Sequence, residues 1–135
     1  MRIAWEVVEL LDRFPAHATI PVSDLERAKA WYRDKLGLVP KEEDPGGAYF
    51  ESGGTTFALF PTPFAGTAKN TAMEWSVDDV SAIVSELKGR GVVFDHYDMP
   101  GVEWEGDVAS MGPFKGAWFK DSEDNILALT QGAGS

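Results

Sequence analysis

Two ionisable residues in strand-like segments are the first candidates for chemistry. His17 begins the segment 17–22, and Glu74 lies in the segment 72–77. An imidazole whose pKa is near neutrality can carry a proton, and a histidine–carboxylate pair can act as acid and base when the two groups are close. A buried carboxylate is costly unless it is paired or solvated. We therefore expect Glu74 to receive a cationic group of a ligand, or to pair with Lys, Arg or His17. His17 could instead be satisfied by a neighbouring residue.

Aromatic residues form the second candidate surface. The chain has five Trp, eight Phe and three Tyr. Flat organic ligands favour apolar cavities that carry a few polar anchors. The candidate ligand contacts lie on or near predicted strands and in the segment 98–114; they are Phe60, Trp104, Phe114 and Trp118. Each of these four could also be an ordinary core residue.

Composition narrows the class of protein. A chain of 135 residues is expected to form one domain. Cysteine is absent, which excludes disulfides and thiolate metal sites. The net charge of -10 argues against nonspecific nucleic-acid binding, and it is compatible either with a cationic ligand or with solubility alone. The apolar runs are shorter than a membrane span, and the N-terminus is too acidic for a signal peptide. We expect a cytoplasmic protein without a membrane partner.

An internal repeat organises the chain. Val22 and Val77 are 55 residues apart, and so are Asp24 and Asp79. A repeat of this length indicates one supersecondary unit used twice. Each copy is predicted to hold a strand, a helix and three further strands. We therefore expect an α+β fold with two tandem βαβββ modules.

The boundaries of the modules follow from local patterns. The first module is predicted to span 15–60 and the second 72–131, with a Pro- and Gly-containing linker at 61–71. Before them, Ile3, Val7, Leu10, Leu11 and Phe14 recur at helical spacing, so the extension 1–14 is expected to form a short helix.

The helices have recognisable ends. Ser23 and Glu26 match a capping box at the start of the first helix, and Gly37 is a plausible C-terminal cap. Asp78 is expected to cap the second helix. Strands are predicted at about 17–22, 38–42, 48–52 and 55–60 in the first module, and at about 72–77, 92–97, 115–120 and 125–130 in the second. Residues 98–114 are expected to form a long irregular insertion.

The sequence resembles the vicinal oxygen chelate superfamily, which includes glyoxalase I, extradiol dioxygenases and the fosfomycin- and bleomycin-resistance proteins. The resemblance covers about residues 15 to 131. It rests on four stretches: His17-Ala-Thr-Ile-Pro-Val-Ser-Asp24-Leu-Glu-Arg-Ala, Trp31-Tyr32-Arg-Asp, Leu36-Gly37-Leu38, and Phe119-Lys-Asp121-Ser-Glu-Asp-Asn125. The last stretch departs from the usual Asp-Pro-Asp-Gly-Asn turn of the family, although Asp121 and Asn125 keep their places. The resemblance implies that the two modules curl a mixed sheet into a cup, with helices outside.

The resemblance also implies where a metal ion would be bound. The corresponding positions are His17, Ala58, Ala72 and Ala128, so three of the four side chains are methyl groups. A catalytic divalent metal needs about three protein ligands and an open position. Glu74 lies two residues beyond Ala72, roughly 6.5 Å along an ideal strand, and with His17 it would supply two ligands. We therefore expect no metal cofactor at the usual position.

Three functions remain open at the level of sequence. The first is a metal-free, bleomycin-resistance-like homodimer that binds a small aromatic or cationic molecule in its cup. The second is a divalent-metal-dependent lyase, isomerase or dioxygenase with an atypical ligand set that includes His17 and Glu74, or with ligands completed by a second chain. The third is a non-catalytic assembly module. The alanines and the net charge favour the first hypothesis, whereas the many enzymes of the family favour the second.

Overall fold

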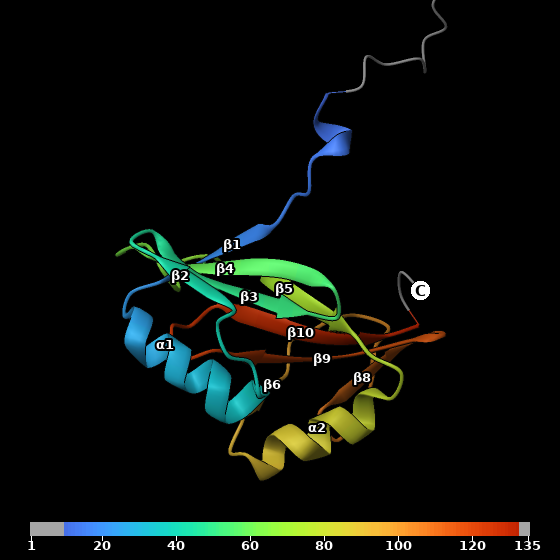
Figure 1. Cartoon of the computed structure of the whole chain (residues 1–135). Helices are drawn as coiled ribbons and strands as arrows, with labels where there is room; N and C mark the ends of the chain where they lie inside the picture. Colours follow the sequence, from blue (N-terminus) through green and yellow to red (C-terminus); the bar gives the residue numbers. More distant parts are fainter. Residues whose placement is uncertain (1–9, 133–135) are drawn as a thin grey trace, which may run out of the picture.

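The computed structural model describes residues 10–132, and its strands form two hydrogen-bonded sheets (Figure 1). The first sheet has the order β1-β4-β3-β2, built from β1 (Ala18–Val22), β2 (Glu42–Asp44), β3 (Gly47–Ser52) and β4 (Thr55–Pro61). The second has the path β5-β10-β9-β8-β7, built from β5 (Thr71–Ser76), β7 (Glu103–Glu105), β8 (Val108–Met111), β9 (Phe114–Lys120) and β10 (Ile126–Gln131). Strand β6 (Phe94–Asp95) also pairs with β9. The predicted α+β class and the tandem arrangement are confirmed.

One helix of each module covers its sheet. Helix α1 (Leu25–Trp31) continues into the π-helical turn η2 (Tyr32–Leu36), and α2 (Val80–Gly89) is the helix of the second module. Both lie on the same side of the molecule, below the strands in Figure 1. Among the described residues, no helix is long and apolar enough to cross a membrane.

The helix caps differ from the predicted ones by one residue. The N-cap of α1 is Asp24, whose side chain accepts a hydrogen bond from the Arg27 backbone N–H, so the capping box of Ser23 and Glu26 is wrong. The N-cap of α2 is likewise Asp79 and not Asp78. The two capping residues, Asp24 and Asp79, are 55 positions apart, which is the spacing of the repeat. The same local geometry therefore recurs at the start of the helix in each module. The predicted cap at Gly37 is confirmed, with φ 70°.

The strand predictions fail where the second module is longest. Residues 98–114 are not an irregular insertion, because they contain the hairpin of β7 and β8. In the order of the sheet, β8 takes the place that β2 has in the first module. The strand predicted at 92–97 is reduced to β6, and the one predicted at 38–42 begins only at Glu42. Short polar strands such as β2 lack the alternation from which strands are predicted.

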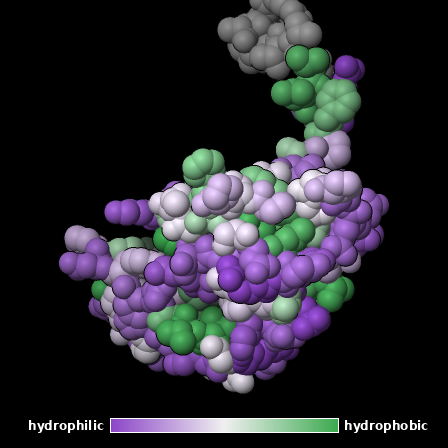
Figure 2. All heavy atoms as spheres, turned by 90° about the vertical axis from the view of Figure 1, so that its left-hand side faces the viewer, coloured by the Kyte–Doolittle hydropathy of each residue, from purple (hydrophilic) through white to green (hydrophobic). Residues whose placement is uncertain are grey.

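The predicted N-terminal helix is reduced, in its described part, to the single turn η1 (Leu11–Arg13). Its positions Ile3 and Val7 lie outside the described residues. Leu10, Leu11 and Phe14 are 60%, 76% and 56% exposed. Figure 2 shows this segment as hydrophobic atoms on an arm beyond a mostly hydrophilic face. Within residues 10–132, these three side chains therefore do not belong to the buried core.

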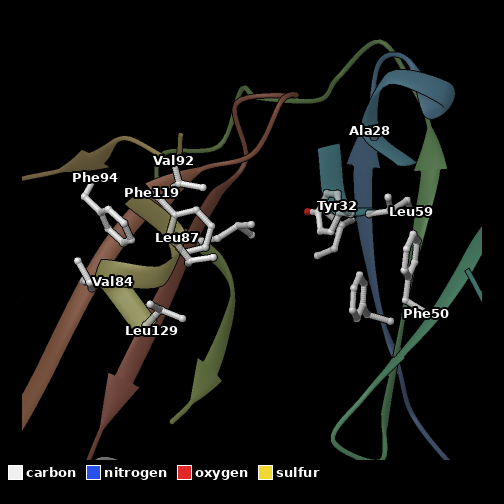
Figure 3. Close-up of a cluster of buried hydrophobic side chains, with 14 of the residues drawn as sticks. Ala28, Tyr32, Phe50, Leu59, Val84, Leu87, Val92, Phe94, Phe119 and Leu129 are labelled. Atoms are coloured by element: carbon white, nitrogen blue, oxygen red, sulfur yellow. The ribbon is translucent and has the colours of Figure 1, made fainter. Parts of the chain in front are cut away.

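The core is built from the helix-facing sides of both sheets. Figure 3 shows Ala28, Tyr32, Phe50 and Leu59 in one group and the labelled side chains of the second module in another. Phe50 and Phe57 stack in the first module, with ring centroids 5.1 Å apart. Trp31 of α1 stacks on Phe119 of β9 at 6.3 Å, and this contact joins the two groups.

A buried glutamate joins the two modules. Glu123, in the turn between β9 and β10, is 4% exposed and accepts hydrogen bonds from the backbone N–H groups of Ser23 and Asp24. Its carboxylate also forms an ion pair with Arg27 at 2.9 Å. The Arg27 guanidinium, together with hydrogen bonds from Ser122, Asp24 and Ser23, lowers the pKa of Glu123 to about 2 despite burial. The carboxylate thus holds the start of α1 to the second module.

The same turn carries a second buried contact to the first module. The Tyr32 hydroxyl donates to Asp121 Oδ2 at 2.7 Å, and burial raises the pKa of Tyr32 well above its ordinary value. Asn125 Nδ2 donates to Asp121 Oδ2 and to the carbonyl of Pro21. Asp124, which departs from the glycine of the family turn, still has a positive φ of 66°, a conformation that Asp tolerates better than most residues.

Candidate functional site

A cleft of about 500 Å³ opens between the two modules. It is bounded by the entry to β1, the β3–β4 turn with the start of β4, and the middle of β5. Its lining residues are Ala16, His17, Ala18, Ser52, Gly53, Thr55, Thr56, Phe57, Met73, Glu74, Trp75 and Ser76. His17 and Glu74, singled out from the sequence, therefore line one cleft from opposite modules.

Strand geometry determines how His17 and Glu74 reach this cleft. His17 directly precedes β1, and Glu74 is in the middle of β5. Both side chains are exposed to solvent. The His17 ring meets Tyr49 of β3 edge-on, with centroids 6.0 Å apart. An exposed imidazole and an exposed carboxylate can both exchange protons and contact a ligand that enters the cleft.

Two aromatic side chains, one from each module, form the apolar wall of the cleft. Phe57 of β4 and Trp75 of β5 meet edge to face, with centroids 6.5 Å apart. Trp75 Nε1 donates a hydrogen bond to Ser52 Oγ at 3.0 Å. Since Ser52 ends β3 and Trp75 belongs to β5, this bond crosses from one module to the other. Thr55, Thr56 and Ser76 add hydroxyl groups around this wall.

The other three positions that the resemblance assigns to metal ligands carry no donor atom. Ala58 is 4% exposed and Ala128 is 1% exposed. Ala72 lies where the β5–β10 register shifts: Ile126 pairs with Thr71, whereas the next residue, Leu127, pairs with Met73. Ala128 therefore pairs with Glu74 and not with Ala72. This register shift places the backbone of Glu74 beside Ala128, where an unshifted register would place Met73.

The donor set within the described part of the chain does not fit a divalent metal ion. No group of three or more His, Cys, Asp or Glu side chains in residues 10–132 is arranged to hold one. At the four family positions, His17 alone has a ligating atom. A catalytic metal ion needs about three protein ligands, and these positions supply fewer.

The predicted aromatic contacts separate into different places. Trp104 of β7 and Trp118 of β9 are neighbours, with centroids 6.2 Å apart, and Trp118 pairs with Ala128 of β10. Trp104 also stacks on His96 at 4.2 Å. Phe60 is half-buried on β4, and Phe114 is 42% exposed at the start of β9. None of these four predicted residues lines the cleft.

Sequence reasoning missed three residues that shape the cleft, namely Ser52, Phe57 and Trp75. Strand alternation put Phe57 opposite Ala58 and Trp75 opposite Glu74, which predicts core positions. Both side chains do pack against the core, yet their edges also face the space between the modules. In the sequence, the one signal for Trp75 is that it is an aromatic residue directly after Glu74. Its hydrogen-bond partner Ser52 lies in the other module and could not be recognised from the sequence.

The sequence matches a known family over most of its length. A sequence model described as the Glyoxalase/Bleomycin resistance protein/Dioxygenase superfamily matches residues 15–128. No curated protein sequence matches the chain.

Several crystal structures are similar to the whole fold. The fosfomycin resistance protein FosX from Listeria monocytogenes is 14% identical, with a TM-score of 0.66, covering 95% of this chain and 96% of FosX. Lactoylglutathione lyase from Agrobacterium tumefaciens is 19% identical, with a TM-score of 0.63, covering 88% of this chain and 95% of the lyase. A glyoxalase/bleomycin resistance protein/dioxygenase from Alicyclobacillus acidocaldarius is 18% identical, with a TM-score of 0.64, covering 88% of this chain and 91% of that protein. At these identities the likeness shows the fold alone. Another structure of the Listeria FosX contains Mn(II) and a sulfate ion.

Proposed function

Because the chain belongs to the Glyoxalase/Bleomycin resistance protein/Dioxygenase superfamily, we propose that it binds a small organic molecule directly, without a metal ion between protein and ligand. The cleft between the modules is the proposed site. The observation that carries the proposal is the composition of this cleft: an ionisable side chain from each module beside an aromatic wall. That combination suits a flat or apolar molecule with one charged group.

The donor set supports direct binding. The Listeria FosX binds Mn(II) in its crystal structure. At the positions that the family resemblance assigns to metal ligands, this chain has His17 and three alanines, so methyl groups stand where three donor side chains are expected. His17 and Glu74 together give two ligands, fewer than a catalytic site requires.

The charge of the protein favours a cationic ligand. The net charge is -10, and the carboxylate in the cleft is Glu74. An exposed carboxylate attracts a cation through its charge. His17 and the hydroxyl groups of Thr55 and Thr56 can accept or donate hydrogen bonds to the polar end of the ligand.

A pair of probes of opposite charge tests this proposal. Benzyltrimethylammonium and phenylacetate are titrated into the protein by calorimetry, with Trp fluorescence as a second readout. We expect saturable binding of the cation and weaker binding of the anion. Glu74→Gln should weaken the cation by about fivefold or more, as expected for one nearby charge. Glu86→Gln, an exposed carboxylate on α2, is the matched control and should change nothing.

Two outcomes would overturn the proposal. Equal affinity of wild type and Glu74→Gln for the cation would remove the cleft as its site. One equivalent of Mn²⁺, Ni²⁺ or Zn²⁺ that survives dialysis in wild type and is lost in His17→Ala would support the metal-dependent enzyme instead.

We also predict a homodimer, which sedimentation at micromolar concentration checks.

A further inference from the structure

A second hollow, of about 200 Å³, lies at the seam of the two modules. We call it the seam pocket. Its lining residues come from η2, the loop after it, β3, β5, the loop before α2, α2, β9 and β10; they are Leu36, Leu38, Ser52, Trp75, Val77, Ile83, Leu87, Phe119 and Leu129. Eight of these nine residues are hydrophobic. The chemistry of this hollow therefore differs from that of the cleft, where His17 and Glu74 lie.

Two residues belong to both hollows, namely Ser52 and Trp75. Trp75, whose indole N–H donates a hydrogen bond to Ser52 Oγ, therefore lines both hollows. The two spaces are thus adjacent. A molecule that extends past Trp75 contacts the charged groups of the cleft at one end and the apolar seam pocket at the other.

The seam pocket is suited to a hydrocarbon group. Leu87, Phe119 and Leu129 are buried at 6%, 0% and 3% exposure, whereas Leu36, Leu38, Val77 and Ile83 are half-buried around them. The Ser52 Oγ already accepts the Trp75 N–H. Since a dry apolar cavity of about 150 Å³ accommodates benzene, a pocket of this size holds a six-membered ring or a short alkyl chain.

We propose that the ligand is amphipathic, with its cationic or polar end in the cleft and a hydrocarbon group in the seam pocket. This inference rests on the proposed function, because it assigns the polar end to the same cleft. It adds a determinant of ligand length that lies on the helix side of the sheets. The side chain of Ile83, on α2, and that of Leu36, on η2, then limit the size of the hydrocarbon group.

A series of alkyltrimethylammonium ions with two to eight carbons in the alkyl chain tests the inference. Burial of one methylene corresponds to about fourfold in affinity when it is complete. We expect affinity to rise about two- to fourfold per carbon and to level off when the seam pocket is full. Ile83→Phe, which fills the pocket, should abolish the rise but leave the binding of the shortest ion unchanged. Ser85→Phe, which adds the same ring at an exposed position of α2, is the control and should keep the rise.

A second variant guards against a folding defect in Ile83→Phe. Leu36→Ala enlarges the pocket and should move the levelling point to a longer chain. In ¹H–¹⁵N spectra, the amides of Leu36 and Ile83 should shift with the long ions and not with the shortest one.

Three results separate this inference from the proposed function. If the shortest ion binds but affinity does not depend on chain length, the inference is wrong and the proposed function stands. A rise that persists unchanged in Ile83→Phe would also overturn the inference, since the chain would then lie elsewhere. If no cation binds at all, the proposed function fails and the inference fails with it.

Discussion

The two modules have the same strand order but hold the start of their helices in different ways. β1-β4-β3-β2 corresponds to β5-β10-β9-β8, and both helices are capped by an aspartate. In addition to this cap, the backbone N–H groups of Ser23 and Asp24, at the start of α1, donate hydrogen bonds to the Glu123 carboxylate of the other module. At the start of α2, the Val80 backbone N–H donates a hydrogen bond of 2.8 Å to the side-chain amide oxygen of Gln131, which belongs to the same module.

The difference lies in the turn between the last two strands of each module. The first module has Gly53-Gly54 between β3 and β4, with open space around both glycines. The second has Asp121 to Asn125, where the buried Glu123 and Asp121 carboxylates contact α1 and η2, and the Asn125 amide contacts β1. One copy of the repeat thus keeps a simple hairpin beside the cleft, while the other copy joins the modules. A repeated unit can specialise through its turns without changing its sheet.

The largest expected effect is the loss of the Glu123 carboxylate. Glu123→Ala removes the buried partner of Arg27 and of the Ser23 and Asp24 N–H groups, so unfolding in urea should show a loss of about 3–4 kcal/mol. Gln131→Ala removes one neutral acceptor at the equivalent place, and its cost should be about 1 kcal/mol. Equal losses in the two variants would show that the contact between modules adds nothing to an ordinary helix cap.

The acid stability of the protein should reflect the same carboxylate. The pKa of Glu123 is lowered from 4.5 to about 2 in the folded protein. A lowered pKa stabilises the fold above the pKa of the unfolded chain, and this contribution is lost as the pH falls through the folded value. The difference in unfolding free energy between wild type and Glu123→Gln should be roughly 3 kcal/mol near pH 7. It should stay constant down to about pH 4.5 and shrink towards pH 2. A difference that does not depend on pH would contradict this reading of the ion pair.

A pair of glycines at matching places in the repeat gives the next comparison. Gly47 precedes Ala48, which pairs with Leu59, and Gly116 precedes Ala117, which pairs with Leu129. A Cβ on Gly47 would lie 2.2 Å from the carbonyl oxygen of Leu59, whereas one on Gly116 would meet the Trp118 ring at 3.4 Å. Gly47→Ala should cost about 1–3 kcal/mol from overpacking.

Gly116→Ala is the control for Gly47→Ala and should cost less than about 1 kcal/mol, because the Trp118 side chain can shift. Thermal and urea unfolding measure both variants. A larger cost for Gly116→Ala would contradict this expectation. It would mean that the Trp118 side chain moves aside less readily than the Leu59 backbone does.

The smallest effect concerns the second contact of the acidic turn. Tyr32→Phe removes one hydrogen-bond donor to the Asp121 carboxylate. Asp121 still accepts hydrogen bonds from the backbone N–H groups of Glu123 and Asn125 and from the side-chain amide of Asn125. The cost should be about 1–2 kcal/mol in urea unfolding. Tyr49→Phe removes a hydroxyl from a half-buried tyrosine of the first sheet and should stay within about 0.5 kcal/mol. If the two variants are alike, the Tyr32–Asp121 contact does not contribute to joining the modules.

Much of the fold could be predicted from local patterns. Alternation along 17–22 and 55–60 predicts which residues face the helices, because successive side chains of a strand point to opposite faces. The repeat of 55 residues gives both modules, but both N-terminal helix caps were predicted one residue too early, at Ser23 and Asp78 in place of Asp24 and Asp79. The hairpin of β7 and β8 was missed, since three- and four-residue strands carry too few side chains to show a period.

The candidate site could be predicted only in part. His17 and Glu74 are recognisable because ionisable residues are unusual in such segments. Trp75 and Ser52 are not recognisable in this way, because their hydrogen bond joins residues 23 positions apart that belong to different modules. Trp104 and Trp118 have suitable side chains, but neither lines the cleft.

The sequence by itself determined the α+β class, the two modules and the presence of alanine at positions 58, 72 and 128, because periodicity and residue identity are local properties. The tertiary structure alone decided that His17 and Glu74 share a cleft, that a bulge at Ala72 brings Glu74 beside Ala128, and that Glu123 holds α1. The reason is physical: Glu123 and Ser23 are 100 residues apart. Contacts at such separation depend on how the two sheets pack, which no local pattern encodes.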